Sequence, residues 1–265
     1  MRKLAFMYDF DETLCNGEAQ YFDLFNMLNL DSDTFWAENL DNCMLTNTDV
    51  VLGFLYKFMI ITKRNNIKLT ANFLREAGKN IEFFKGVEEW FDRINKYALD
   101  RGFEIEHYII SCGMKNIIQG SKIADKFRCI FANDYIYDNE GVAYWPSQVV
   151  NYTTKTQYIF RVKKNLVDNL TDTKRINDKV SEGEILPYAN MFYFGDGDTD
   201  IPCMKVVKDK GGKSVCVYNP DIEKKRFGAM KILADGRVNA IAQADFSEGS
   251  ALDLYIKQAI DDLLQ

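Results

Sequence analysis

The stretch MYDFDETLCNGE, residues 7–18, decides how the rest of the sequence is interpreted. It contains two aspartates one residue apart, Asp9 and Asp11, directly after the apolar run that begins at Leu4. A short, continuous apolar run followed by a turn signal predicts a buried strand over residues 4–10. Two carboxylates at the end of such a strand repel each other unless a cation, a shared proton or open water separates them.

The composition is that of an ordinary globular protein. The 265 residues are 47% apolar and 27% charged, with a formal net charge of −6, which disfavours non-specific binding to nucleic acid or anionic membranes. No apolar run is long enough to cross a bilayer, and the apolar run before Asp9 is too short for a signal peptide. The six cysteines show no CxxC spacing. We expect a cytoplasmic monomer or homodimer without nucleic-acid or membrane partners.

The spacing of apolar residues changes near residue 84. Before it, helical periodicity with capping residues at Asp31, Asp49 and Thr70 predicts several helices. Their aromatic side chains are expected to form the core of this helical unit: Phe25, Phe35, Trp36, Phe54 and Phe58.

After residue 84, helices alternate with short apolar segments. Strands are predicted over 105–111, 128–132, 191–194 and 214–217, with a hairpin around residues 135–144. Such alternation is typical of an α/β fold with a mostly parallel sheet covered by helices on both faces. We therefore predict an α/β core made of residues 1–15 and 84–265, interrupted by an all-helical insertion over residues 16–83.

Polar residues follow three of the predicted strands. Asp9 and Asp11 follow the first, Ser111 ends the second with Gly113 close behind, and residues 195–200 read GDGDTD after a later one. Because ligands bind beyond the carboxyl ends of the strands in open parallel sheets, we expect these groups to converge. Carboxylate oxygens without nearby histidine or paired cysteine favour Mg²⁺ over zinc.

Each of these features has a simpler interpretation when it stands alone. The acidic pair is consistent with a surface turn, Ser111 with a structural serine and Lys155 with an exposed helix residue. His107, the only histidine, is expected to fill a strand rather than to activate Ser111. A calcium-binding loop in GDGDTD is excluded, because Ile201 and Val207 occupy the positions where an EF-hand requires Gly and Glu.

In their order, however, four features resemble the motifs of the haloacid dehalogenase superfamily of phosphohydrolases. These are DFDET after the first strand, an apolar strand ending in Ser111, Lys155 opening a helix, and GDGDTD after a later strand. The resemblance spans Asp9 to Asp200. It implies a Rossmann-like parallel sheet flanked by helices, with a cap inserted after the first motif, here of the helical C1 type of the phosphoserine phosphatase-like subgroup.

The resemblance also implies the chemistry of the first motif. Asp9 would be the nucleophile that forms an aspartyl-phosphate, and Asp11 would be the general acid and then the general base. Mg²⁺ would be held by Asp9, Asp196 and the backbone carbonyl of Asp11. Thr13 would fix the turn. An acid at position 11 favours a phosphatase or mutase, because dehalogenases lack this acid and transport ATPases carry threonine there.

The remaining motif residues would bind the phosphoryl group. Ser111 and the backbone N–H groups near Gly113 would donate hydrogen bonds to its oxygens. Lys155 would neutralise phosphate and carboxylate together. Asp200 would support the metal site or orient Lys155.

The substrate is less clearly specified. The position of Glu18 matches a glutamate that holds the substrate ammonium in the phosphoserine phosphatase-like subgroup, although an acid at a helix N-terminus is an equally good interpretation. Arg64 and Arg75 have no matching context for a substrate carboxylate, and Thr199 replaces the asparagine common in the last motif. The sequence thus predicts a Mg²⁺-dependent phosphomonoesterase for a small phosphorylated metabolite, with a phosphoserine-like substrate as one candidate. A phosphotransferase or phosphomutase with the same intermediate, and a non-catalytic Mg²⁺- or phosphoprotein-binding module, are the alternatives.

Overall fold

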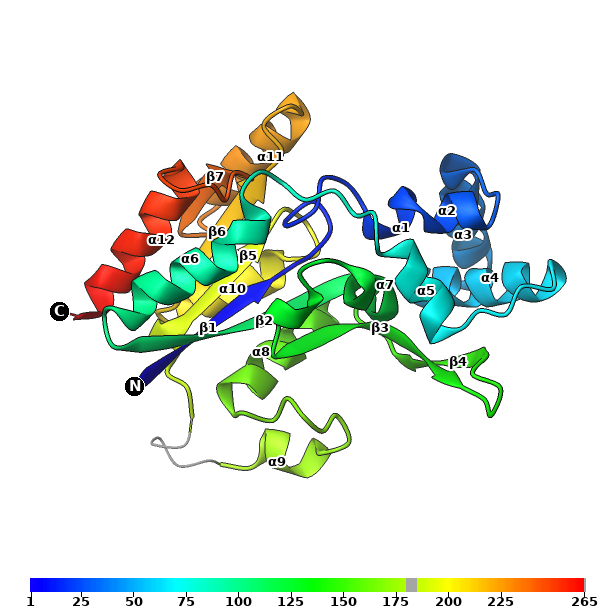
Figure 1. Ribbon diagram of the computed structural model, residues 1–265, viewed down its shortest axis with the longest axis horizontal. Coiled ribbons are helices and arrows are strands. Elements are labelled where there is room, and N and C mark those ends of the chain that lie inside the picture. The colour runs from blue at the N-terminus through cyan, green and yellow to red at the C-terminus, as the bar shows by residue number, and fades with distance from the viewer. Residues whose placement is uncertain (180–184, 265) are drawn as a thin grey trace.

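The computed structural model describes residues 1–179 and 185–264 and contains a twisted sheet with helices on both faces and a helical unit at one end (Figure 1). The described strands follow the spatial order β4-β3-β2-β1-β5-β6-β7, and every neighbouring pair is parallel except β3 with β4. The predicted α/β class with a mostly parallel sheet is confirmed. The strands are β1 (Arg2–Tyr8), β2 (Phe103–Met114), β3 (Cys129–Tyr137), β4 (Ala143–Gln148), β5 (Met191–Gly195), β6 (Lys213–Tyr218) and β7 (Ala240–Gln243).

Strand β1 lies at the centre of the sheet and is buried on both faces. Leu4, Phe6 and Tyr8 pack with the helices α6 (Val87–Leu99) and α12 (Ala251–Asp261) on one face. Ala5 and Met7 pack on the other face with α8 (Thr156–Lys163), α10 (Ile201–Asp209) and α11 (Glu223–Ala234). A strand covered on both faces is apolar throughout, which explains why the sequence shows no alternation here.

The segment between β1 and α6 folds into the helical unit. Its helices are α1 (Ala19–Phe22), α2 (Leu24–Met27), α3 (Ser32–Thr46), α4 (Val50–Arg64) and α5 (Ala71–Ala77). Asp31, Asp49 and Thr70 accept the capping N–H groups of α3, α4 and α5, as predicted. The expected aromatic core is also confirmed, since the rings of Phe35 and Phe58 stack with centroids 4.5 Å apart.

The helical unit is attached to the sheet at two places. Where the chain leaves and returns, the N–H of Asn16 donates to the Glu82 carbonyl at 3.0 Å, and the N–H of Phe84 donates to the Leu14 carbonyl at 3.0 Å. The long hairpin of β3 and β4 reaches the unit as well (Figure 1), where the hydroxyl of Tyr135 donates to the Leu55 carbonyl at 2.8 Å. A continuous apolar cluster joins the two parts.

Several predicted boundaries were wrong for local reasons. The first strand ends at Tyr8 and not at residue 10, because the N–H groups of Leu14 and Cys15 fold back onto the carbonyl of Phe10. The segments 128–132 and 135–137 form the single strand β3, and β2 continues past Ser111. The helix expected over residues 155–166 ends at residue 163, and the terminal helix expected over residues 247–264 begins behind Ser250. A break at Asp23 separates α1 from α2.

Other elements had not been predicted: β7, α9 (Thr173–Asn177), α10 and α11. Helix α7 (Lys115–Gly120) follows β2, in the stretch where a helix was expected. Among the described residues, no single helix is long and apolar enough to cross a membrane. Helices α3 and α4 meet the criteria of length and composition only as a pair, bent by 117° at the break between them.

The only histidine lies in a buried hydrogen-bond chain, as expected of a strand residue. The indole N–H of Trp90 donates to the Tyr8 hydroxyl at 3.0 Å, so this hydroxyl donates in turn to Nδ1 of His107 at 3.1 Å. Nε2 of His107 therefore carries the proton and donates to Oδ1 of Asn95 at 2.9 Å. Burial lowers the pKa of His107 to about 3, so the ring is neutral in the folded protein.

This arrangement predicts a specific sensitivity to acid. The unfolded chain binds a proton at His107 near pH 6.5, whereas the folded chain does not until about pH 3, so folding loses stability as the pH falls between these values. The contribution is about 2 kcal/mol between pH 7 and pH 5. Urea denaturation at both pH values should show a smaller loss for His107→Gln than for the wild type. Equal losses in the two proteins would contradict the neutral buried ring.

Candidate active site

Asp9 lies directly beyond β1, where the backbone is still held to the sheet. Its N–H donates to the carbonyl of Phe194 in β5 at 2.8 Å, and its side chain is buried, with 5% of the residue exposed. The carboxyl group therefore stands at the carboxyl edge of two adjacent parallel strands. This is the position at which open parallel sheets bind ligands.

Lys155 provides the positive charge closest to Asp9. It ends a 3₁₀ turn, Tyr152–Lys155, that continues into α8, and its side chain is completely buried. Its Nζ lies 3.1 Å from Oδ1 of Asp9 and donates to Oδ1 of Asp200 at 2.8 Å and to the Thr199 hydroxyl at 3.2 Å. Burial alone lowers the pKa of a lysine, but Asp200 and Asp9 raise the pKa of Lys155 well above its usual value. Lys155 is therefore a buried, charged residue and not an exposed one.

Asp200 connects Lys155 to the loop after β5. Its Oδ1 also accepts the hydroxyl of Tyr193 at 2.7 Å, and its Oδ2 accepts the backbone N–H of Asp196 at 3.3 Å. This packing requires glycine at position 195, because an added Cβ there would stand 2.5 Å from Cγ of Asp200. The close approach of Asp200 to the backbone thus explains why GDGDTD begins with glycine.

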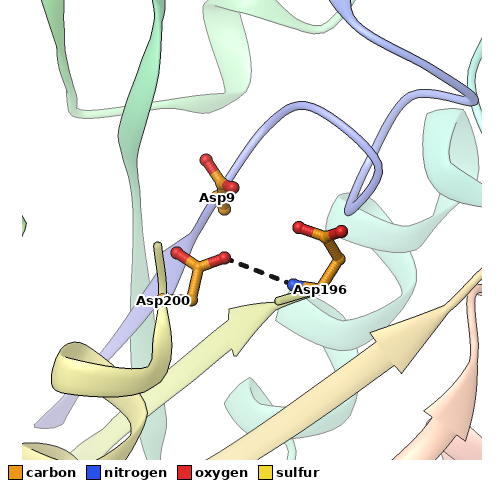
Figure 2. Close-up of side chains that lie close together, drawn as sticks. All are labelled: Asp9, Asp196 and Asp200. Carbon is orange, nitrogen blue, oxygen red and sulfur yellow. Dashed lines mark hydrogen bonds between the residues drawn. The ribbon is translucent and has the colours of Figure 1, made fainter. Parts of the chain in front are cut away.

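Three carboxyl groups gather beyond the strand ends in an arrangement able to hold a metal ion (Figure 2). One oxygen from each of Asp9, Asp196 and Asp200 lies within 4.8 Å of the others. Burial and then the charge of Asp200 raise the pKa of Asp9 well above its usual value, and the same two causes raise the pKa of Asp196 to about 6. A divalent cation would remove this repulsion, and an oxygen-only donor set suits Mg²⁺.

The side chain of Asp11 is not part of this carboxyl cluster. Its Oδ1 accepts the N–H of Ala19 at 2.7 Å, which ties the first turn of the helical unit to the DFDET loop. Burial raises the pKa of Asp11 to about 7, with an added contribution from Glu18 and an opposing one from the Ala19 N–H. A carboxyl group with such a pKa is suited to proton transfer near neutral pH. The predicted metal contact of Asp11, through its backbone carbonyl, stays a prediction.

Ser111 and Gly113 lie beside Asp11 on the irregular end of β2. The buried Ser111 hydroxyl accepts the N–H of Gly113 at 2.9 Å. A Cβ at position 113 would stand 3.0 Å from Oδ2 of Asp11 and 3.2 Å from Oγ of Ser111. Glycine therefore leaves room for the serine hydroxyl and the acid to face the same small space.

Thr13 and Glu18 complete the set of residues predicted from the sequence. Thr13 is fully buried within the turn after Asp11, and its hydroxyl has no hydrogen-bond partner among the described residues. Glu18 stands at the N-cap position of α1 and lines the cleft above the cluster. The structure thus brings every predicted residue to one region, and their roles stay predictions.

Lys225 was missed by the sequence analysis. It lies on α11, beyond β6, and its Nζ donates to Oδ2 of Asp196 at 2.8 Å and stands 3.6 Å from Oε2 of Glu12. Burial alone would lower the pKa of Lys225, but Asp196 raises it above its usual value. The sequence could have indicated only the region, because the strand predicted over 214–217 ends on the same edge of the sheet as β1 and β5; no local pattern identifies Lys225 itself.

A cleft of about 610 Å³ opens above these groups. Its floor contains Asp9, Asp11 and Asp196, and its opposite wall belongs to helices α3 and α4. Trp36 and Phe54, for which a core role was favoured over a substrate-binding one, also line it. The helical unit therefore forms one side of the site.

The comparisons with known structures agree with this geometry. A haloacid dehalogenase (HAD) family hydrolase from Salmonella enterica serovar Typhi has a TM-score of 0.56 at 15% identity, covering 97% of this chain and 71% of that one. Phosphoserine phosphatase with bound substrate has a TM-score of 0.52 at 17% identity, covering 97% and 99%. A phospho-aspartyl intermediate analogue of phosphoserine phosphatase reaches 0.53 at 17% identity, with the same coverage.

The chain has the haloacid dehalogenase-like fold. An uncharacterized protein of Borreliella burgdorferi is 27% identical over 285 aligned positions, covering 97% of this chain and 96% of that protein. No protein-family model matches the sequence. The fold implied by the resemblance of the four motifs is thus confirmed.

The carboxyl cluster predicts stabilisation by Mg²⁺. At a Mg²⁺ concentration one hundred times Kd, binding to the folded state alone adds about 2.7 kcal/mol to the free energy of unfolding. Asp196→Asn should abolish most of this gain, while its metal-free form should be at least as stable as metal-free wild type, because one of the mutually repelling carboxylates is gone. Thermal unfolding with Mg²⁺ and with EDTA measures both.

Asp198→Asn is the matched control for this experiment. Asp198 lies in the same loop but is exposed and outside the cluster, so its substitution should preserve the Mg²⁺-dependent gain. A gain that survives in Asp196→Asn, or disappears in Asp198→Asn, would contradict the proposed donor set.

Proposed function

We propose that this protein is a Mg²⁺-dependent phosphomonoesterase that hydrolyses a small phosphorylated metabolite through an aspartyl-phosphate. The observation that carries the proposal is the buried ion pair between Lys155 and Asp9, 3.1 Å apart, beside the carboxyl group of Asp196. The fold shared with phosphoserine phosphatase supports the same reaction class. Fold alone does not decide function, and the proposal rests on these side chains.

In the first step, a carboxylate oxygen of Asp9 attacks phosphorus, and the bond between phosphorus and the leaving oxygen breaks. Asp11, partly protonated near neutral pH because its pKa is about 7, donates its proton to that oxygen, so the product leaves as an alcohol. Lys155 and the Ser111 hydroxyl face the phosphoryl oxygens and offset their charge. Mg²⁺ held by Asp9 and Asp196 would lower the repulsion between the attacking carboxylate and the phosphate dianion.

In the second step, Asp11 takes a proton from a water molecule whose oxygen attacks phosphorus. The acyl-phosphate bond to Asp9 breaks, and inorganic phosphate leaves. Asp200 holds Lys155 in place throughout through its 2.8 Å hydrogen bond. The carboxyl groups thus divide the work: Asp9 would be nucleophile and metal ligand, Asp11 the proton carrier, Asp196 a metal ligand and Asp200 the anchor of the lysine.

We also propose that residues 16–83 act as a cap over this site, with residues 1–15 and 84–265 as the catalytic core. Support comes from the paired backbone segments at Asn16–Glu82 and Leu14–Phe84. At these paired segments the chain leaves the core and returns to it, so the helical unit is one continuous insertion beside the site. Glu18, at the lip of the cleft, is the proposed contact of a positively charged substrate group. All six cysteines are free, which supports the proposed cytoplasmic location.

The decisive assay is phosphate release from p-nitrophenyl phosphate and from an alkyl phosphate such as glycerol phosphate. Asp9→Asn should reduce both by at least about a thousandfold, and EDTA should abolish both. In single-turnover measurements of the first step, Asp11→Asn should slow phosphoryl transfer from the alkyl ester far more than from the nitrophenyl ester, because only the alkoxide needs a proton to leave.

Asp209→Asn serves as the control, since this exposed acid at the end of α10 contacts only Lys205 among the interactions described. It should retain wild-type rates. Phosphate release that persists in Asp9→Asn, or an equal loss of the single-turnover transfer rate on both esters in Asp11→Asn, would contradict the assigned roles. Adding free alcohols during the assay shows in addition whether phosphoryl transfer competes with hydrolysis.

A further inference from the structure

The outer part of the cleft has a distinctive chemical character. Asp33 and Trp36 line it from α3, three residues apart and therefore on the same face of that helix. Val50, Val51 and Phe54 line it from α4. The part of the cleft that would surround the leaving alcohol thus combines an aromatic and aliphatic wall with a carboxylate.

Positive charge is scarce in the same cleft. Of the described lysines and arginines, Lys225 alone lines it, and Lys225 already pairs with Asp196 and Glu12 on the floor. The cleft therefore offers no second cation to a substrate carboxylate.

The cations of the helical unit are engaged elsewhere. Lys57 donates to the Phe35 carbonyl and to Glu38, and Lys68 pairs with Glu140 of the hairpin. Arg75 bonds to Asn72 and Gln119, while Arg64 lines a separate cavity between α3 and α4. The arginine that a substrate carboxylate would need is thus missing from the described lining.

The excess of acidic residues in the cleft also argues against a substrate that carries a carboxylate. Six acidic residues line it against one lysine: Asp9, Asp11, Glu12, Glu18, Asp33 and Asp196. Lys155 and Lys225 pair with carboxyl groups at the floor, whereas Asp33 at the outer wall forms no ion pair with a described lysine or arginine. A phosphate ester that carries its own positive charge beyond the ester oxygen would match this distribution.

We infer that the substrate is the phosphate monoester of a cationic alcohol without a carboxylate, that is, an amino alcohol or a quaternary ammonium alcohol. Its cation would lie among Glu18, the Asp33 carboxylate and the aromatic side chains of Trp36 and Phe54, which line the same cleft. Aromatic faces attract such cations, and more strongly when the site is partly desolvated. This inference rests on the proposed phosphatase function and narrows its substrate class away from phosphoserine.

The test compares matched substrates in Mg²⁺-dependent phosphate release. Phosphocholine and 3,3-dimethylbutyl phosphate have the same shape and differ in one positive charge, while phosphoethanolamine and phosphoserine differ in one carboxylate. We expect kcat/KM to be at least about tenfold higher for phosphocholine than for its neutral isostere, and at least about tenfold higher for phosphoethanolamine than for phosphoserine.

Two variants test which side chains cause the preference for a cationic substrate. Asp33→Asn and Trp36→Leu should each lower the ratio of phosphocholine to neutral isostere by about threefold or more. Asp41→Asn is the matched control, because Asp41 is an exposed acid of the same helix and does not line the cleft. Its ratio should equal that of the wild type.

Binding to Asp9→Asn, measured by calorimetry with Mg²⁺, gives a second readout that does not depend on turnover. Release of phosphate from p-nitrophenyl phosphate, combined with equal or better use of the neutral isostere or of phosphoserine, would overturn this inference and leave the phosphatase function standing. No release from any ester would overturn the phosphatase function instead. In that case, equal binding of phosphocholine and its neutral isostere would also overturn the cation site.

Discussion

The buried charge of Lys155 is the interaction on which the site depends. Removing a lysine from water costs several kcal/mol, roughly, unless paired carboxylates repay it. Asp9 at 3.1 Å and Asp200 at 2.8 Å provide this pairing from two different strand ends. The same lysine offsets the repulsion that the adjacent acids of the first loop would otherwise experience, so the ends of β1 and β5 can carry carboxyl groups inside the protein.

The two lysines do not fully balance the negative charge of the carboxyl cluster, and this imbalance favours binding of a metal ion. Asp9 and Asp196 have raised pKa values even with Lys155 and Lys225 nearby. Binding of a divalent cation between these carboxyl groups is therefore favourable, because the cation offsets their mutual repulsion. The helical unit adds Asp33, Trp36 and Phe54 above the cluster. In the proposed reaction, the chemistry would therefore come from the sheet edge and the substrate contacts largely from the insertion.

The sequence predicted the parts of this protein whose signals are local. The caps at Asp31, Asp49 and Thr70 are examples, because a capping side chain needs only the next turn of its own helix. The convergence of Asp9, Ser111 and Asp200 was also predictable, since a parallel sheet places its carboxyl ends on one edge. The place of Lys155, which follows the antiparallel strand β4, was expected only from the family resemblance. What the sequence could not provide depends on contacts between distant segments. Lys225 meets Asp196 only after β6 and α11 have packed, and no pattern near position 36 shows that Trp36 lines a cleft as well as a core.

The central claim is that Asp9 is the group that accepts a phosphoryl moiety, and one measurement tests it most directly. Beryllofluoride mimics a phosphoryl group when it binds an aspartate oxygen, and ¹⁹F NMR distinguishes bound from free fluoride. With Mg²⁺ present, we predict a bound signal in the wild type that is absent in Asp9→Asn and absent when EDTA replaces Mg²⁺. A bound signal that persists in Asp9→Asn, or no bound signal in folded wild-type protein with Mg²⁺, would contradict the account.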